Sequence, residues 1–243
     1  MIDSKKRSLV KAISWRLIAI CILAVVSFLL LGDLKTASLI TLFYHVIQVA
    51  IYMFHERMWN YISWGKTKGV FIQMTGLSGA GKTTLAKNIE HRLKKRGLQV
   101  EVIDGDEYRK NLCQDLGFSK EDRNTNIKRL SFVGKVLSRN NVICIMSAIN
   151  PYDSVRKEIK QMNASSKLVY VKCGVETLKK RDPKGLYKRA LLPKGDPNRV
   201  DNFTGISDPY EAPQAPDLII DTENLILENA LDKLENFIAE SIE

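Results

Sequence analysis

Two long runs without charged residues lie near the start of the chain, at residues 17–31 and 36–54. Each approaches the ~20 residues that a helix needs to cross a bilayer. Only residues 32–35 separate them, so two spanning helices would form an antiparallel hairpin. A cleaved signal peptide would need small residues at its cleavage site, which residues 29–33 do not offer, and a helix in a soluble core would show a polar face. The pattern predicts a two-helix transmembrane hairpin over residues 1–65.

Basic residues gather on one side of both runs, which sets the predicted orientation. Five precede the first run and three follow the second, whereas the intervening loop has one lysine and one aspartate. Because cytoplasmic flanks carry the excess of Lys and Arg, both chain termini are expected in the cytoplasm. Four aromatic residues stand where an interfacial belt would lie: Trp15, Trp59, Tyr61 and Trp64. The one histidine of the second run, His45, suits an interhelical hydrogen bond.

From about residue 66 onward, short apolar runs alternate with longer amphipathic ones. The apolar runs predict strands at residues 70–74, 99–103, 142–146, 167–173 and 217–221. The clearest helical patterns cover residues 82–96, 120–140 and 225–242. Such alternation is typical of a parallel sheet covered by helices on both faces. The expected fold class is α/β: a P-loop kinase-like parallel sheet flanked by helices over residues 66–243, preceded by an α-helical transmembrane hairpin.

A glycine-rich sequence separates the first predicted strand from the helix that follows it. It reads Gly-Leu-Ser-Gly-Ala-Gly-Lys-Thr and matches the phosphate-binding pattern G-x-x-x-x-G-K-[ST] in full. Glycines let successive backbone N–H groups turn toward phosphate oxygens, and the helix N-terminus adds positive potential. We expect Lys82 to contact the β- and γ-phosphates of ATP and the Thr83 hydroxyl to bind Mg²⁺. The predicted nucleotide-binding residues are Gly76, Leu77, Ser78, Gly79, Ala80, Gly81, Lys82, Thr83 and Thr84.

Acidic residues follow the second predicted strand, as Asp104-Gly105-Asp106. Ligands of a parallel sheet bind beyond the carboxyl ends of its strands, so these carboxylates are expected to face the glycine-rich loop. There a carboxylate can hold Mg²⁺ or accept the proton of an attacking hydroxyl. The same tripeptide is also common turn chemistry, and the residues alone do not decide between the two.

Charge and cysteine content narrow the function classes. The formal net charge is +10, and residues 1–69 contribute +6 of it, from nine Lys or Arg against three Asp or Glu. Most of the excess thus lies beside the predicted membrane, where anionic lipid attracts it. No basic stripe interleaved with aromatic residues predicts nucleic-acid binding. The four cysteines lack metal-binding spacing and suit a reducing cytosol.

Several further motifs resemble the adenylylsulfate kinase family, in family order over about residues 67–241. They are Asp104-Gly105-Asp106-x-x-Arg109, Leu116-Gly117-Phe118-Ser119-x-x-Asp122-Arg123-x-x-Asn126-Ile127-x-Arg129, Arg181-Asp182-Pro183-Lys184-Gly185-Leu186-Tyr187 and Phe203-Thr204-Gly205-Ile206-x-x-Pro209-Tyr210-Glu211-x-Pro213. The resemblance implies transfer of the γ-phosphoryl group of ATP to the ribose 3′-hydroxyl of adenosine 5′-phosphosulfate (APS). The products would be PAPS and ADP, in sulfate assimilation.

The start of the chain has a resemblance of its own. Residues 7–16 and 55–60 are similar to a small two-helix membrane domain of unknown function found in bacteria. This resemblance implies no chemistry. It implies tethering to the lipid bilayer of a bacterial inner membrane, with the kinase domain in the cytoplasm.

The family resemblance also implies roles for individual residues. For the substrate these are Arg109, Arg123 and Asn126 at the phosphosulfate, Phe118 and Phe203 around the adenine, Ile149 and Leu186 along that pocket, and Lys184 on a lid. Catalysis would rest on Lys82, Asp104 and Asp106, with Asp106 orienting the hydroxyl and binding Mg²⁺ beside Thr83. Residues 182–216 hold six of the seven prolines and form the predicted lid, because a long stretch without clear strand or helix is typical of a functional loop. A homodimer and a sulfotransferase or sulfate-assimilation partner are further candidates.

Two departures from the family pattern leave alternatives open. Asn150 stands in Ile149-Asn150-Pro151, where the family usually has a serine that has been proposed as a phosphorylated intermediate. Direct in-line transfer is therefore expected here. Residues 191–200 replace a shorter segment within the predicted lid. The alternatives are a related P-loop kinase that phosphorylates another acceptor, and a weakly catalytic nucleotide sensor whose hairpin is the output element.

Overall fold

The computed structural model describes residues 5–61 and 68–242. They fall into two compact units, within Met1–Lys66 and Thr67–Glu243. Trp64, expected in the aromatic belt, lies outside the described residues. Each unit has its own helices and its own packing, so the two are treated in turn.

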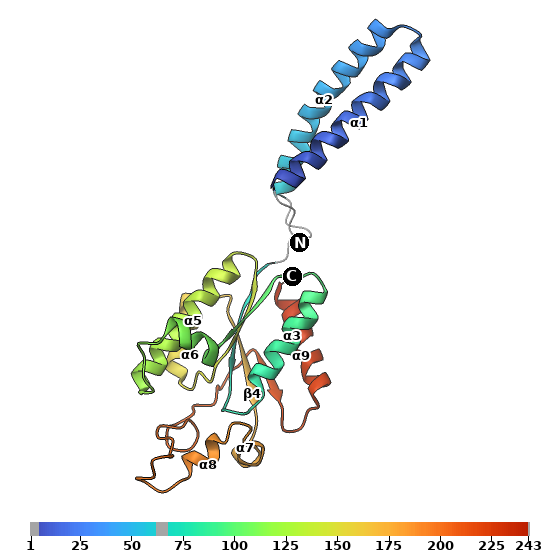
Figure 1. The fold of residues 1–243 in the computed structure, drawn as a ribbon. Coiled ribbons are helices and arrows are strands. Elements are labelled where there is room, and N and C mark those ends of the chain that lie inside the picture. The colour runs from blue at the N-terminus through green and yellow to red at the C-terminus, as the bar shows by residue number, and fades with distance from the viewer. Residues whose placement is uncertain (1–4, 62–67, 243) are drawn as a thin grey trace. The chain divides into compact units, whose positions relative to one another are not determined.

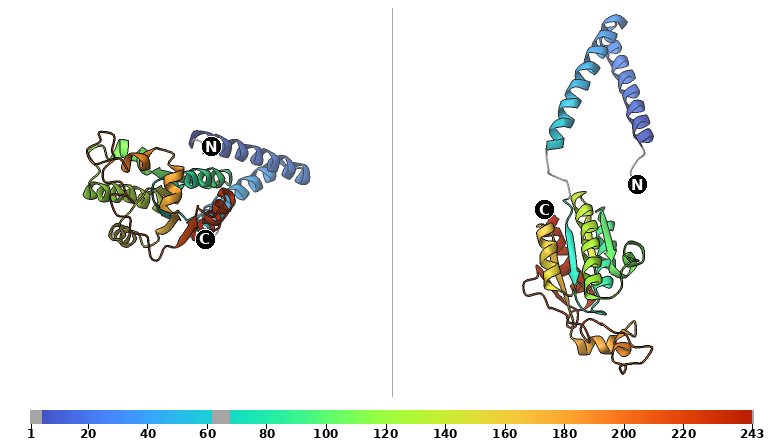
Figure 2. Two further views of the ribbon diagram at one scale, coloured as in Figure 1. Left: turned by 90° about the horizontal axis from the view of Figure 1, so that it is seen from below. Right: turned by 90° about the vertical axis from the view of Figure 1, so that its left-hand side faces the viewer.

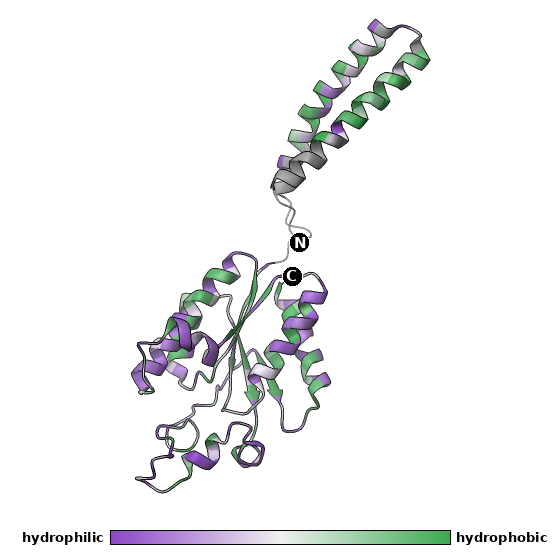
Figure 3. Ribbon diagram, in the orientation of Figure 1, coloured by the Kyte–Doolittle hydropathy of each residue, from purple (hydrophilic) through white to green (hydrophobic). Residues whose placement is uncertain are grey.

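The first unit is a helical hairpin. Helix α1 (Lys5–Leu31) packs along α2 (Leu34–Tyr61), and the turn between them places Gly32 at a positive φ of 66°. The Asp33 carboxylate accepts a hydrogen bond from the Thr36 N–H at 2.9 Å and so caps the start of α2. Hydrophobic residues predominate along both helices (Figure 3), and most of their apolar side chains are exposed.

Small and polar side chains line the seam between the two helices. Ser27, Ala37 and Thr41 are buried there, which lets the backbones approach closely. Arg16 Nη1 donates to Gln48 Oε1 at 2.9 Å and joins α1 to α2. The interhelical hydrogen bond expected of His45 is absent among the described residues, where both of its buried ring nitrogens lack a partner.

The two helices differ in how well they meet the requirements of a membrane span. Within the described residues, length and composition qualify one helical segment, Lys35–Phe54, which covers 20 residues. The apolar part of α1, Trp15–Leu30, is shorter. The helical pairing expected from the sequence is present, whereas insertion of both helices in a membrane stays a prediction.

The second unit is built on a five-stranded parallel sheet, and the predicted fold class is confirmed. Its strands are β1 (Phe71–Thr75), β2 (Val100–Asp104), β3 (Ile143–Ser147), β4 (Lys167–Lys172) and β5 (Leu218–Asp221). They are ordered β2-β3-β1-β4-β5, so β1 pairs with β3 on one side and with β4 on the other. The direction of the crossovers therefore reverses at β1. The loop after β1 opens at this switch point, where parallel sheets bind their ligands.

Helices cover both faces of the sheet (Figures 1 and 2). On one face lie α3 (Lys82–Lys95) and α9 (Leu227–Ile242), and on the other lie α5 (Lys120–Arg139) and α6 (Asp153–Met162). Alternate side chains of β1 enter the two cores: Ile72 and Met74 pack toward α3 and α9, and Phe71 packs toward α5. A strand buried on both faces has to be apolar on both, which is why β1 reads as a continuous hydrophobic run.

Three short helices were not evident in the sequence pattern. Helix α4 (Gly105–Leu112) follows β2 directly, and α7 (Val175–Arg181) follows β4. Helix α8 (Leu186–Ala190) lies within residues 182–216, so the expectation of a lid without helix is wrong for this part. In Figure 1, α7 and α8 lie at the end of the sheet where the strands finish, on the same side as the loop after β1.

Candidate active site

The loop after β1 is held in a conformation that only glycine permits at its first residue. Gly76 has a φ of 152°, and a Cβ there would lie 2.4 Å from the carbonyl oxygen of Val171 on β4. At the other end of the loop, Gly81 caps α3 with a φ of 95°. The N–H groups of the first turn of α3 have no partner within the helix and suit phosphate oxygens.

Side-chain donors hold the loop from its carbonyl side. Lys82 Nζ donates to the carbonyl oxygens of Gly76 and Leu77, both at 2.8 Å. The Tyr187 hydroxyl donates to the Ser78 carbonyl at 3.0 Å, and the Thr222 hydroxyl donates to the Ala80 carbonyl at 2.9 Å. The donors come from α3, α8 and the end of β5, so three separate segments fix the path of the loop.

Burial changes the acidity of Lys82. Its side chain is buried, and desolvation is the largest cause that lowers its pKa to about 8. The carboxylates of Asp106 and Asp104 act in the opposite direction and raise the pKa, while the positive charge of Lys184 lowers it further. Lys82 is thus a cation that responds to whatever negative charge lies in front of the loop.

Asp104 and Thr83 meet at the edge of the loop. The Thr83 hydroxyl donates to Asp104 Oδ2 at 2.8 Å and lies 3.2 Å from the Ser147 hydroxyl, which sequence reasoning missed. The other oxygen of Asp104 accepts the N–H groups of Asp106 and Glu107 at 3.0 and 3.2 Å and caps α4. The geometry therefore resolves the ambiguity of the tripeptide, because Asp104 makes the turn and faces the loop at once.

The donor set beside the loop suits Mg²⁺. No group of three or more His, Cys, Asp or Glu side chains is found within residues 5–61 and 68–242. Mg²⁺ needs no such group, since it is commonly bound by one or two carboxylates or hydroxyls, phosphate oxygens and water. Thr83 and Asp104 supply such donors side by side. Asp106, expected as a ligand, instead pairs with Lys184 Nζ at 2.6 Å, and both side chains are mostly exposed.

Aromatic and basic side chains form the opposite wall. The Arg109 guanidinium lies 4.3 Å from the centre of the Phe118 ring, in a cation–π contact. Arg109 also donates to the carbonyl oxygens of Leu116 and Gly117, which fixes its orientation. Phe118 is 67% exposed, whereas Phe203 is 7% exposed. The Phe118 ring is thus presented to solvent while Phe203 is packed into its surroundings.

Arg123 is occupied by protein partners. Its Nε donates to the Phe118 carbonyl at 3.1 Å, and its Nη1 donates to Thr204 Oγ1 at 2.7 Å and to Asp208 Oδ2 at 3.0 Å. It also donates to the Asn202 carbonyl. In this structure Arg123 ties α5 to the lid.

Two buried amides on this side have unpartnered oxygens. Among the described residues, Oδ1 of Asn126 and Oδ1 of Asn150 have no hydrogen-bond partner. Unsatisfied buried oxygens are uncommon and costly, and these two belong to residues that line one cavity. They are therefore candidates for ligand contacts.

These groups surround one cavity of about 810 Å³. Every residue predicted for the site lines it, except Gly76, Leu77 and Ala80. The structure thus brings together loop, acidic turn, α5 and lid, which are far apart in the sequence. It adds two lid arginines that sequence reasoning did not assign, Arg189 and Arg199, and Tyr187, whose motif was noted without a role.

Comparison with known proteins identifies the family. The family model described as adenylylsulphate kinase matches residues 68–221. This chain belongs to the adenylylsulfate kinase family. The kinase is 45% identical to an adenylyl-sulfate kinase of Halothermothrix orenii over 173 residues, which are 71% of this chain and 91% of that protein. It is 46% identical to a probable adenylyl-sulfate kinase of Pseudomonas aeruginosa over 68% of this chain and 75% of that protein.

A solved structure supports the same assignment. The APS kinase of Mycobacterium tuberculosis in complex with AMPPNP and APS superposes with a TM-score of 0.66 at 31% identity, over 71% of this chain and 98% of that one. Residues 9–60 match a second family model, described as predicted membrane protein (DUF2061). Both resemblances seen in the sequence are therefore confirmed, and the kinase is an enzyme of the phosphotransferase class.

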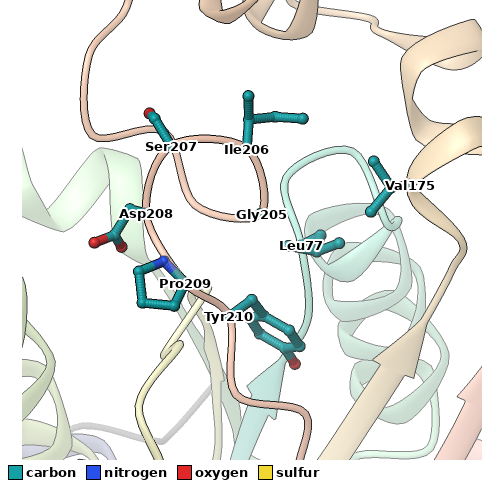
Figure 4. A pocket seen from close by; sticks show the side chains of 8 residues that line it. All are labelled: Leu77, Val175, Gly205, Ile206, Ser207, Asp208, Pro209 and Tyr210. Carbon is teal, nitrogen blue, oxygen red and sulfur yellow. The ribbon is translucent and has the colours of Figure 1, made fainter.

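A pair of lid glycines tests how closely the lid of this kinase must approach the loop. Gly205 (φ 89°) and Gly195 (φ 95°) have similar backbones, but a Cβ at Gly205 would lie 2.6 Å from Leu77 Cδ2, whereas one at Gly195 meets nothing within 4 Å. Figure 4 shows Gly205 beside Leu77 at a second pocket of about 460 Å³. Both alanine variants carry the backbone strain of about 1 kcal/mol, but only Gly205→Ala displaces Leu77. We expect Gly205→Ala to raise the Kd for ATP about fivefold in titration calorimetry and Gly195→Ala to stay within about twofold. Equal effects of the two variants would contradict this close contact.

The lowered pKa of Lys82 predicts a pH dependence of nucleotide binding. Below pH 8 the ammonium is charged, and above pH 8 the free enzyme loses this proton, which a bound triphosphate restores. The Kd for ATP should therefore be flat between about pH 7 and 8 and rise up to about tenfold per pH unit above that. Lys82→Met should bind weakly with a flat profile. A wild-type Kd that stays constant to about pH 9.5 would show that the proton is not lost.

Proposed function

We propose that this protein transfers the γ-phosphoryl group of ATP to the 3′-hydroxyl of APS. The observation that carries the proposal is the single cavity that joins a phosphate-binding loop to a wall of Arg109, Phe118, Asn126 and Phe203. A kinase with two nucleotide substrates needs such a cavity, since both must be enclosed with their reacting atoms in line. The solved relative that binds AMPPNP and APS supports this choice of substrates.

At one end of the cavity the loop would hold the phosphates of ATP. Lys82 would exchange the carbonyls of Gly76 and Leu77 for phosphate oxygens, with the charge favoured by its new anionic neighbours. Thr83 and Asp104 would hold Mg²⁺, which neutralises charge on the β- and γ-phosphates. No residue of this half-site has to form a covalent bond.

At the other end the kinase would orient the acceptor. The exposed ring of Phe118 and the ring of Phe203 offer faces or edges to an adenine, and Arg109 stacked on Phe118 offers a guanidinium to the phosphosulfate. The unpartnered Asn126 oxygen would accept a hydrogen bond from the ligand. Asp106 would orient the 3′-hydroxyl, and its ion pair with Lys184 would place the lid above it.

Asn150 supports direct transfer. Its backbone lies at a positive φ of 43°, and its amide Nδ2 donates to Gln73 Oε1 at 3.2 Å. Its carbonyl oxygen accepts from the Thr75 hydroxyl at 3.0 Å and from Arg156 Nη1 at 2.9 Å. The residue is thus anchored by three neighbours, and a carboxamide has no hydroxyl that could carry a phosphoryl group.

The decisive experiment measures ADP release from ATP and Mg²⁺ by residues 65–243, with and without APS. We expect release to depend on APS and the product to carry its new phosphate on the 3′-oxygen, as identified by mass spectrometry and NMR. Lys82→Ala should lower turnover at least about a thousandfold, because it removes the charge at the transferred phosphate. The lid arginines Arg189 and Arg199 favour one alternative, a different anionic acceptor. ADP release that ignores APS would support that alternative and refute the proposal.

We further propose that residues 1–65 tether the kinase to a membrane. The match to the predicted membrane protein family and the apolar segment Lys35–Phe54 support it. The exposed apolar side chains of both helices would then face lipid, while the Arg16–Gln48 hydrogen bond lies within the hairpin. A bacterial inner membrane, cytoplasmic termini, a homodimer and a sulfotransferase partner stay predictions.

Membrane tethering predicts a clear fractionation result. The full-length chain should sediment with membranes, resist extraction by carbonate at pH 11 and be released by detergent. Residues 65–243 should remain in the supernatant under the same conditions, because the exposed apolar helices are gone. A full-length chain found wholly in the supernatant without detergent would refute the hairpin as a membrane anchor.

A further inference from the structure

We propose that Tyr187 couples the two substrate half-sites of the kinase, so that binding of one nucleotide strengthens binding of the other. The inference rests on the proposed function and adds to it a positioning residue on the lid. Tyr187 lies on α8, between the glycine-rich loop and Phe203. Neither the sequence motif in which it occurs nor its chemistry had suggested a role.

One end of Tyr187 touches the ATP half-site. Its hydroxyl donates to the carbonyl oxygen of Ser78 at 3.0 Å. Ser78 is in the middle of the loop, so this hydrogen bond orients the peptide group whose N–H belongs to Gly79. Burial raises the pKa of Tyr187 to about 12, which keeps the hydroxyl protonated and able to donate across the physiological range.

The ring of Tyr187 touches the acceptor half-site. It meets the ring of Phe203 edge-on, with centroids 4.9 Å apart and planes at 85°. Edge-to-face pairs have a preferred geometry, so a ligand that seats Phe203 also sets the position of the Tyr187 ring. The same residue is 2% exposed and cannot adopt another rotamer without disturbing the core.

The base of α8 keeps this connector in place. The Asp182 carboxylate accepts the N–H groups of Tyr187 and Lys188 at 3.1 and 3.0 Å, and it thereby caps the helix. Gly185 precedes the helix at a positive φ of 65°. Tyr187 is therefore attached to a rigid turn rather than to a free loop.

Coupling follows from sharing one connector. The first nucleotide to bind must order the loop, Tyr187 and Phe203 together, and the second binds to a site that is already ordered. The effect must be reciprocal: ATP raises the affinity for APS by the same factor as APS raises the affinity for ATP. Breaking the hydroxyl contact separates the two halves without removing a ligand contact from either.

The test uses the full-length chain in detergent and titration calorimetry. We measure the Kd of AMPPNP with Mg²⁺ alone and with saturating APS, and the Kd of APS alone and with saturating AMPPNP. In the wild-type chain both ratios should exceed one and agree. Tyr187→Phe keeps the ring against Phe203 and removes only the hydrogen bond, so it should reduce both ratios about fivefold while changing each single-ligand Kd by less than about twofold.

A matched control distinguishes coupling from a general loss of stability. Tyr108→Phe removes a comparable hydroxyl contact, to Glu101 Oε1 at 3.0 Å, from a position outside the cavity. It should shift the melting temperature like Tyr187→Phe but keep the wild-type ratios. Unchanged ratios in Tyr187→Phe, or single-ligand affinities that fall together at constant coupling, would overturn the inference alone. A wild-type chain that binds AMPPNP but not APS would overturn the proposed function and the inference with it.

Discussion

The close approach of the glycine-rich loop to β4 is the constraint on which the site depends. The chain leaves β1 with no room for a side chain at Gly76, because the Val171 carbonyl lies where a Cβ would be. This path is possible because β1 is the central strand, at which the crossovers reverse. Once there, the loop directs its carbonyls to donors on Lys82, Tyr187 and Thr222. Backbone oxygens that are satisfied by the protein do not face a phosphate, so the arrangement sorts the peptide groups of the loop by charge.

Electrostatic balance in the cavity follows from the same geometry. A buried ammonium is costly, and Lys82 tolerates it through two carbonyl contacts and two nearby carboxylates. Asp104 serves three elements at once, since it ends β2, caps α4 and accepts the Thr83 hydroxyl. A carboxylate fixed in this way cannot turn away from the loop. Asp106 is fixed less firmly, because both it and its partner Lys184 are mostly exposed, and it can therefore follow the lid.

The sequence predicted the parts of this site whose chemistry is local. The glycine-rich loop, the acidic turn after β2 and the five strands each have a signature within ten residues, and the structure contains them. The partner of Arg123 could not be found in that way, because Asp208 lies 85 residues further along the chain and only the folded lid brings it near. Helix α8 was missed since five residues between glycine and proline signals show no period. The role of Tyr187 likewise depends on Ser78 and Phe203, which are remote in sequence.

The backbone at Asn150 explains how a kinase of this family can hold an asparagine where serine is usual. The residue adopts a left-handed conformation, which asparagine tolerates better than most residues with a side chain. Its carbonyl is held by Thr75 and by Arg156, a buried arginine that would be costly without such acceptors. The amide adds a contact to Gln73 on the central strand, which a serine hydroxyl is too short to make in the same way. Asparagine therefore strengthens the turn that separates β3 from α6, and the loop, Mg²⁺ and carboxylates suffice for in-line transfer without a hydroxyl at this position.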